Sequence, residues 1–319
     1  RLEEDLATAL LFDKDVDVSL VPNLYDLSSD HSGMLFLRSA PGDLVILAWL
    51  FPRASRWILD RNGVKGHVGE SLLNEPDEDA EDDTVEDRDD SQAIGAWNVP
   101  NRRIYCIDLR DHTDARVYLD EIHRIARECT PQATELLSWI QGQPNAQQLE
   151  RYLHPDKLLA EQSNGNGHAA DDQVRRRWYP VIDYSRCTNC MECIDFCLFG
   201  VYGVDGADRI LVEQQDNCKK GCPACSRVCP ANAIMFPQHK TPEIAGAEGG
   251  EVTGLKIDLS KLFGAPSALE LAAQERDVEL VADGREAVGM TVGIPKRQEA
   301  AKAQPRDALD DLMDGLDAL

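Results

Sequence analysis

Eight of the ten cysteines in this 319-residue chain fall into two short runs with almost the same spacing. Four thiols within about a dozen residues, present twice, provide two ligand sets for metals such as iron and zinc. The N-terminus shows no export signal, so we expect these cysteines to bind metal rather than to form disulfides. The runs consist of Cys187, Cys190, Cys193 and Cys197, and of Cys218, Cys222, Cys225 and Cys229.

The two runs form an internal repeat. Cys187 and Cys218 are 31 residues apart, and each later pair of equivalent cysteines is 32 residues apart. Gaps of two, two and three residues are typical of bacterial ferredoxins, and residues 180–237 resemble their dicluster domain, which binds two 4Fe–4S clusters. The resemblance implies that the fourth cysteine of each run serves the other cluster. The first cluster would then use Cys187, Cys190, Cys193 and Cys229, and the second Cys218, Cys222, Cys225 and Cys197.

The chain departs from the family pattern in two places. The proline after the fourth cysteine is present as Pro230 but is replaced by Leu198 in the first run. Because proline fixes φ and lacks an N–H group, Leu198 should loosen that turn and leave an extra donor there. The second run begins with a gap of three residues, so we expect the loop to swell at Gly221. Lys219 and Lys220 would then favour the reduced state of the second cluster and raise its potential.

Apolar segments flank both runs and could form strands around the clusters. They are residues 181–183, 200–204, 210–212 and 233–236. The aromatic and aliphatic side chains expected to exclude water from the clusters are Phe196, Leu198, Phe199, Ile234 and Phe236.

Zinc is the simpler alternative to iron and sulfur, because two pairs of cysteines can form a site of four thiolates. Zinc sites usually separate their pairs by a longer loop, whereas here three cysteines share two consecutive short gaps. This spacing favours iron–sulfur clusters. A brown colour would identify them, since zinc is colourless.

The chain is strongly acidic, with a formal net charge of −24. Eleven acidic residues and one arginine lie between Glu75 and Asp90. Such a charge argues against a nucleic-acid partner and favours a redox partner with a basic docking face. No apolar stretch is long enough to span a bilayer, so we expect no membrane association and a cytoplasmic location.

Residues 1–162 are predicted to form an α/β domain in which strands alternate with helices around a small parallel sheet. Residues 74–92 would be a disordered acidic insertion. The predicted strands cover 18–24, 44–50 and 103–109, and the predicted helices 52–61, 113–128 and 131–142.

The remaining chain is predicted as a flexible linker at 163–176, an α+β dicluster ferredoxin domain at 177–240, and a partly disordered helical tail at 241–319. One tail helix is expected over 267–276, with Ser267 as its cap. Another helix is expected over 306–319, and its apolar stripe would either pack against the rest of this protein or dock into a groove of a partner.

The ends of the predicted strands offer a second place for ligands, but polar loops are the simpler interpretation. No glycine-rich phosphate motif follows any strand. Cys106 and Cys129 are expected to be structural, and no histidine is assigned a metal. The polar strand-end residues are Asn23, Tyr25, Asp26, Pro52, Arg53, Asp108, Arg110 and Asp111.

The sequence favours a non-catalytic protein that transfers electrons, as a ferredoxin-like carrier or as a subunit of a larger oxidoreductase. One alternative is an iron–sulfur enzyme or enzyme subunit whose N-terminal α/β domain binds a substrate or cofactor. A weaker alternative is a maturation or scaffold factor that assembles a larger complex.

Overall fold

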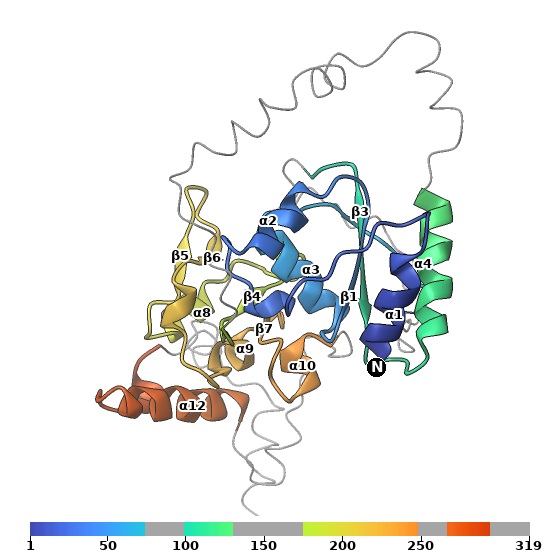
Figure 1. Cartoon of the computed structure of the whole chain (residues 1–319). Helices are drawn as coiled ribbons and strands as arrows, with labels where there is room; N and C mark the ends of the chain where they lie inside the picture. The colour runs from blue at the N-terminus through green and yellow to red at the C-terminus, as the bar shows by residue number, and fades with distance from the viewer. Residues whose placement is uncertain (74–98, 130–174, 248–266, 294–319) are drawn as a thin grey trace, which may run out of the picture. The chain divides into compact units, whose positions relative to one another are not determined.

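The computed structural model describes residues 1–73, 99–129, 175–247 and 267–293 (Figure 1). The chain divides into two compact units: the first contains residues 1–82 and 98–176, and the second contains residues 83–97 and 177–319. The acidic insertion, one helix, nearly all of the linker and the C-terminal helix predicted above lie outside the described residues. These predictions covered 74–92, 131–142, 163–176 and 306–319.

The first unit contains a parallel sheet with the strand order β1-β3-β2. Its strands are β1 (Leu44–Ala48), β2 (His67–Val68) and β3 (Arg103–Asp108). Five successive residues of the central strand β3 are buried, as expected for a parallel strand covered on both faces. The predicted parallel sheet is confirmed, together with two of its three predicted strands.

Helices connect and cover these strands. Helices α3 and α4 follow β1 and β3, as predicted, whereas α1 and α2 were not predicted. Helix α3 begins with Pro52, whose missing N–H costs nothing in the first turn. Helix α1 packs against α4 (Figure 1), and Leu6 and Ile125 from these helices share a core with Tyr105 of β3. The helices are α1 (Leu2–Leu11), α2 (Ser32–Ser39), α3 (Pro52–Arg61), α4 (Ala115–Cys129) and the short 3-10 helix η1 (Leu24–Asp26).

The predicted strand over residues 18–24 is wrong. Residues 18–23 have no regular structure, and η1 begins at Leu24. The apolar run is not buried as a strand would be, because Leu20 is 80% exposed. It is also interrupted by Asn23, whose side chain accepts a hydrogen bond from the backbone N–H of Tyr25 at 3.2 Å and so favours a turn. The third strand is instead β2, which is too short to give an alternating sequence pattern.

The second unit contains two antiparallel strand pairs: one joins the segments that flank the two cysteine runs, and the other lies between the runs. Strand β4 (Val181–Ile182) pairs with β7 (Ile234–Met235), and β5 (Tyr202–Val204) pairs with β6 (Ile210–Val212). All four strands lie within the predicted apolar segments. Two five-residue helices, α8 (Glu192–Phe196) and α9 (Ala224–Val228), occupy equivalent places in the repeat.

A longer helix, α12 (Ala268–Ala282), packs against α9 in the second unit (Figure 1). Ser267 and Glu270 form the capping box at its start, so the predicted cap is correct. The helix continues past the predicted end at residue 276 and stops before Gly284, which has a φ of 75° and ends helices readily. The shorter elements are η3 (Gln215–Asn217), α10 (Pro242–Ala245) and η4 (Gly289–Thr291).

Within the part of the chain that the structure describes, no helix combines the length and the apolar character needed to cross a membrane.

Candidate metal centres

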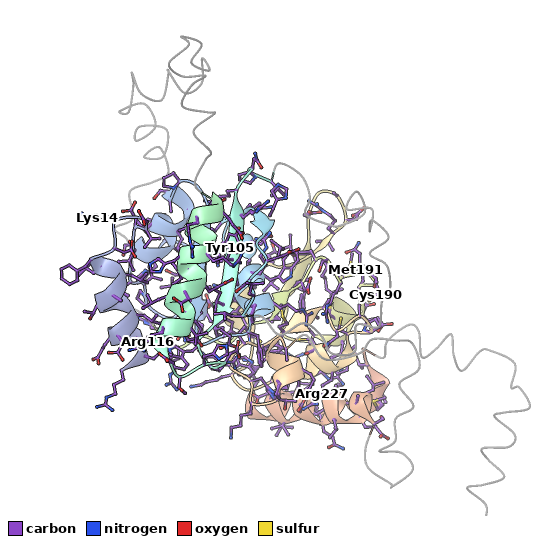
Figure 2. All side chains as sticks on the ribbon, turned by 90° about the vertical axis from the view of Figure 1, so that its right-hand side faces the viewer. Lys14, Tyr105, Arg116, Cys190, Met191 and Arg227 are labelled. Carbon is purple, nitrogen blue, oxygen red and sulfur yellow. The ribbon has the colours of Figure 1, made fainter. Side chains whose placement is uncertain are left out.

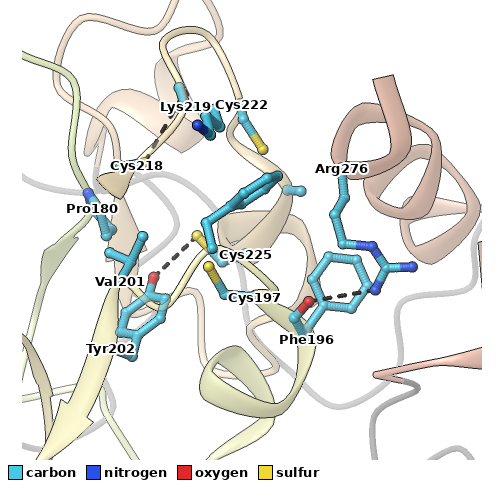
Figure 3. A pocket seen from close by; sticks show the side chains of 12 residues that line it. Pro180, Phe196, Cys197, Val201, Tyr202, Cys218, Lys219, Cys222, Cys225 and Arg276 are labelled. Atoms are coloured by element: carbon cyan, nitrogen blue, oxygen red, sulfur yellow. Dashed lines mark hydrogen bonds between the residues drawn. The ribbon is translucent and has the colours of Figure 1, made fainter. Parts of the chain in front are cut away.

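The eight clustered cysteines line two cavities in the second unit. The fourth cysteine of each run lies at the cavity of the other run. The first cavity is lined by Cys187, Cys190, Cys193 and Cys229. The second, shown in Figure 3, is lined by Cys197, Cys218, Cys222 and Cys225. The structure therefore brings together the same two sets of four that the family resemblance implied.

Short helices bring the third and fourth cysteines of each run to the cavities. Cys193 lies in α8 and Cys225 lies in α9, and both are buried. Cys197 and Cys229 directly follow these helices, and their backbone N–H groups donate to the carbonyls of Cys193 and Cys225 at 3.0 and 3.1 Å. In contrast, Cys190 is exposed; Figure 2 shows it beside Met191.

A left-handed residue precedes the second cysteine of each run. Asn189 has a φ of 56°, and Gly221, which lies 32 residues later, has a φ of 94°. Asn189 is held in place because its side chain donates to the carbonyl of Asp208 at 2.8 Å and accepts from the N–H of Ile210 at 2.9 Å. Since Gly221 matches Asn189, the extra residue of the second run lies within Lys219–Lys220 rather than at Gly221.

Backbone donors reach the fourth cysteine of each run in a repeated pattern. Burial raises the pKa of the Cys197 thiol, while the N–H groups of Phe199 and Val201 act in the opposite direction. Burial also raises the pKa of Cys229, and the N–H groups of Ala233 and Ala231 oppose it. These donors are 32 residues apart in the sequence, so the hydrogen bonds to sulfur follow the repeat despite Leu198.

Burial disfavours free thiolates in both cavities. It raises the pKa of Cys222 to about 11, and it is the main cause of the raised pKa of Cys193 and of Cys225. Neighbouring cysteines of the same cavity raise the pKa values of Cys193 and Cys225 further. Thiolates in such surroundings need a positive metal core, whose binding would release the thiol protons. An all-sulfur ligand set in a buried, largely apolar cavity fits such a core.

Each set of four cysteines lines a cavity. Among the described residues, no three cysteine, histidine or acidic side chains are arranged to hold a single metal ion. The cavities have volumes of about 350 and 330 Å³, including the parts open to solvent.

The side chains around the two cavities differ. Only the second contains a hydroxyl group that donates to sulfur: Tyr202 Oη lies 3.0 Å from Cys225 Sγ (Figure 3). Burial raises the pKa of Tyr202 well above its ordinary value, so this donor stays protonated. The equivalent residue of the repeat is Ile234, which lines the first cavity. Comparison of the two halves could have identified Tyr202 from the sequence, because the pair differs in polarity.

The predicted apolar walls are partly correct. Phe196 and Phe199 line the second cavity, and Ile234 lines the first. Phe236 lies in the core that joins both halves. Leu198 lines neither cavity; its carbonyl instead accepts a hydrogen bond from Arg285 at 2.9 Å.

Two of the polar strand-end residues of the first unit, Asp108 and Arg110, form an ion pair. The guanidinium of Arg110 binds both carboxylate oxygens of Asp108 and lies 3.9 Å from the centroid of the Phe51 ring. Tyr25, Asp26 and Arg53 are buried within the unit. The contacts between Asp108, Arg110 and Phe51 stabilise the loop after β3.

The two remaining cysteines lie in the first unit, as expected for structural residues. Cys106 is buried in β3, and burial raises the pKa of its thiol to about 12. Cys129 is half-buried at the end of α4, with its Sγ 3.5 Å from the Tyr105 hydroxyl.

Comparison with known proteins gives one informative similarity. A segment of 66 residues, 20% of this chain, is 35% identical to a protein of Methanocaldococcus jannaschii described as an uncharacterized ferredoxin. The match covers 44% of that protein, so the chain spans less than half the length of this relative. No family model and no solved structure matches the chain. The similarity supports a ferredoxin-like domain in this chain.

Proposed function

We propose that this protein transfers electrons through two 4Fe–4S clusters, as a ferredoxin-like carrier or as an electron-transfer subunit of a larger oxidoreductase. The observation that carries the proposal is the pair of cavities, each lined by three cysteines of one run and the fourth cysteine of the other. The ligands of the first cluster would be Cys187, Cys190, Cys193 and Cys229, and those of the second Cys218, Cys222, Cys225 and Cys197. Each cluster, when bound, can accept and release a single electron.

The protein's own residues would hold the clusters and exclude water. Buried side chains such as Val201, Ile182 and Ile234 line the cavities and lower the local dielectric. Backbone N–H groups around Cys197 and Cys229 would donate to the sulfur ligands. Such hydrogen bonds, together with exposure to solvent, set the reduction potential of a cluster.

The charge of the chain suits a partner with a basic docking face. A net charge of −24 would steer such a partner toward the protein at low ionic strength. We expect association with the redox partner to weaken as salt is added.

Anaerobic preparation and elemental analysis test the proposed clusters. The protein should contain about eight irons and about eight sulfides per chain. It should be brown and should give an EPR signal after reduction. Stoichiometric zinc, or far fewer irons after reconstitution with iron and sulfide, would contradict the proposal.

We expect Tyr202→Phe to lower the potential of the second cluster. The hydroxyl donates to Cys225 Sγ, and a donor stabilises the more negative, reduced state. A difference of about 1 kcal/mol between the two redox states corresponds to about 40 mV for a one-electron couple. An EPR-monitored redox titration would measure the shift.

Tyr184→Phe is the matched control for this substitution. The Tyr184 hydroxyl donates to the backbone carbonyl of Ile210 at 3.1 Å, and Tyr184 lines neither cavity. The control should leave both potentials in place. An equal shift in both variants would show that the effect of Tyr202 does not depend on its bond to Cys225.

A further inference from the structure

Arg276 places a buried positive charge at the second cavity. The side chain comes from α12, is only 1% exposed, and lines the cavity next to Phe196 (Figure 3). A guanidinium stays protonated in proteins. Burying it is costly unless its donors are satisfied, so the surrounding contacts must hold the charge in place.

Backbone carbonyls supply most of these contacts. Arg276 Nη1 donates to the carbonyl oxygens of Val292 at 3.0 Å and Phe196 at 3.4 Å, and Nη2 donates to that of Gly289 at 2.5 Å. The guanidinium carbon lies 4.4 Å from the centroid of the Phe196 ring. Carbonyls and an aromatic ring stabilise the charge without cancelling it.

The segment that carries Arg276 is fastened to both halves of the repeat. Glu275 binds Arg227 of α9, with a shortest N–O distance of 2.9 Å, and Arg285 donates to the carbonyl of Leu198, which follows α8. Gly293 lies so close to α8 that a Cβ there would be 2.8 Å from the carbonyl oxygen of Asp195. These contacts fix the position of α12 over the second cavity.

Acidic side chains lie near Arg276, but none of them lines the cavity. Asp277 Oδ1 lies 3.3 Å from Arg276 Nε, but Asp277 does not line the cavity, and its Oδ2 accepts from the N–H of Gly289 at 2.6 Å. Glu279 is a minor cause of the raised pKa of Cys218 and of Cys222, and Glu275 is a minor cause of the raised pKa of Cys222. Of the charged side chains around α12, only Arg276 and Lys219 line this cavity.

Lys219 should raise the potential of the second cluster less than the sequence suggested. Its Nζ lies 2.7 Å from Asp283 Oδ2, and both side chains are about one third exposed. The carboxylate and the solvent therefore offset the charge of Lys219. The first cavity contrasts with the second, because no charged side chain lines it.

We propose that Arg276 raises the reduction potential of the second cluster above that of the first, so that the first electron to enter the protein resides at the second site. Reduction adds one negative charge to a cluster. A fixed cation at low dielectric stabilises that charge more strongly than an exposed, paired one. This inference rests on the proposed clusters and assigns their order of reduction.

The test uses the complete, cluster-loaded chain with Arg276→Gln. We expect the equilibrium constant for reduction of the second cluster to fall at least tenfold, which lowers its potential by about 59 mV for a one-electron couple. The first cluster should keep its potential. Arg276→Lys keeps the charge and should recover most of the shift. Arg209→Gln removes an arginine of the second unit that pairs with Asp205 and lines neither cavity, and it should change neither potential.

A test that leaves Arg276 in place is independent of the Arg276 variants. The higher of the two potentials should be the one that Tyr202→Phe shifts, because Tyr202 donates only to a ligand of the second cavity. If Tyr202→Phe shifts the lower potential, the proposed order is wrong even if Arg276→Gln fails to fold. Unchanged potentials in Arg276→Gln, or equal shifts of both, would also overturn it. Iron and sulfide content and the presence of two reductions test the clusters separately.

Discussion

Replacing Cys197 with serine should remove the second cluster and leave the first, although Cys197 belongs to the first cysteine run. Its side chain lies at the second cavity with Cys218, Cys222 and Cys225. Serine is a poor ligand for iron compared with a thiolate, so the second site would lose one quarter of its ligands. The first cavity keeps all four of its cysteines.

Cys229→Ser should have the reciprocal effect, because Cys229 lines the first cavity. In each variant we expect the iron content to fall from about eight to about four per chain. The two variants can be told apart by redox titration. The potential that responds to Tyr202→Phe should disappear in Cys197→Ser and persist in Cys229→Ser.

Cys129→Ser is the control, since Cys129 is a half-buried cysteine of the first unit outside both cavities. It should retain all the iron. If Cys197→Ser instead lost the first cluster, each run would have to serve its own cavity. The crossed ligand sets would then be wrong.

The two sets of four cysteines at the cavities are those that the resemblance to dicluster ferredoxins implied, and that resemblance rests on the spacing of one residue type. Gaps of two and three residues between cysteines constrain the backbone locally, and the repeat of 32 residues shows which positions are equivalent. Comparison of the two halves also shows that Tyr202 in the first half is replaced by Ile234 at the equivalent position of the second. The strands of the second unit were also predictable, since they lie in short apolar segments that flank the cysteine runs, such as 210–212.

Arg276 could not have been predicted in this way. It lies 80 residues from its partner Phe196, in a helix with no motif, and its burial depends on the packing of α12 against α9. The strand predicted over residues 18–24 is wrong for the same reason, because a local apolar pattern does not show whether other elements cover it. Long-range packing determines both the burial of Arg276 and the structure of residues 18–24, and the spacing of residues in the sequence does not reveal that packing.

Removing the clusters should unfold the second unit and spare the first. The cores differ: cysteines such as Cys193 and Cys225 belong to the main core of the second unit, whereas the first unit packs Leu6, Tyr105 and Ile125 around its sheet. The strands of the second unit are only two or three residues long, and α8 and α9 have five residues each. Elements this short need tertiary support.

Metal binding at structural sites contributes on the order of 10 kcal/mol to folding, which is comparable to the whole stability of a domain. Treatment with a chelator and an oxidant should therefore abolish the thermal transition of the second unit. Trp178 provides a local probe, because its ring stacks on Phe236 at 5.2 Å and its Nε1 donates to the carbonyl of Cys222 at 3.2 Å. Its fluorescence should shift to the red when the clusters are removed.

Trp178→Phe should abolish that change, while Trp57→Phe, in α3 of the first unit, should preserve it. Alkylation of Cys106 reports on the first unit, because burial raises its pKa and the thiolate is the reactive form. Cys106 should stay protected after the clusters are removed. If the cluster-free protein keeps Trp178 half-buried and shows an unchanged thermal transition of the second unit, the polypeptide alone builds the two cavities. The clusters would then bind to a fold that forms without them rather than being part of its core.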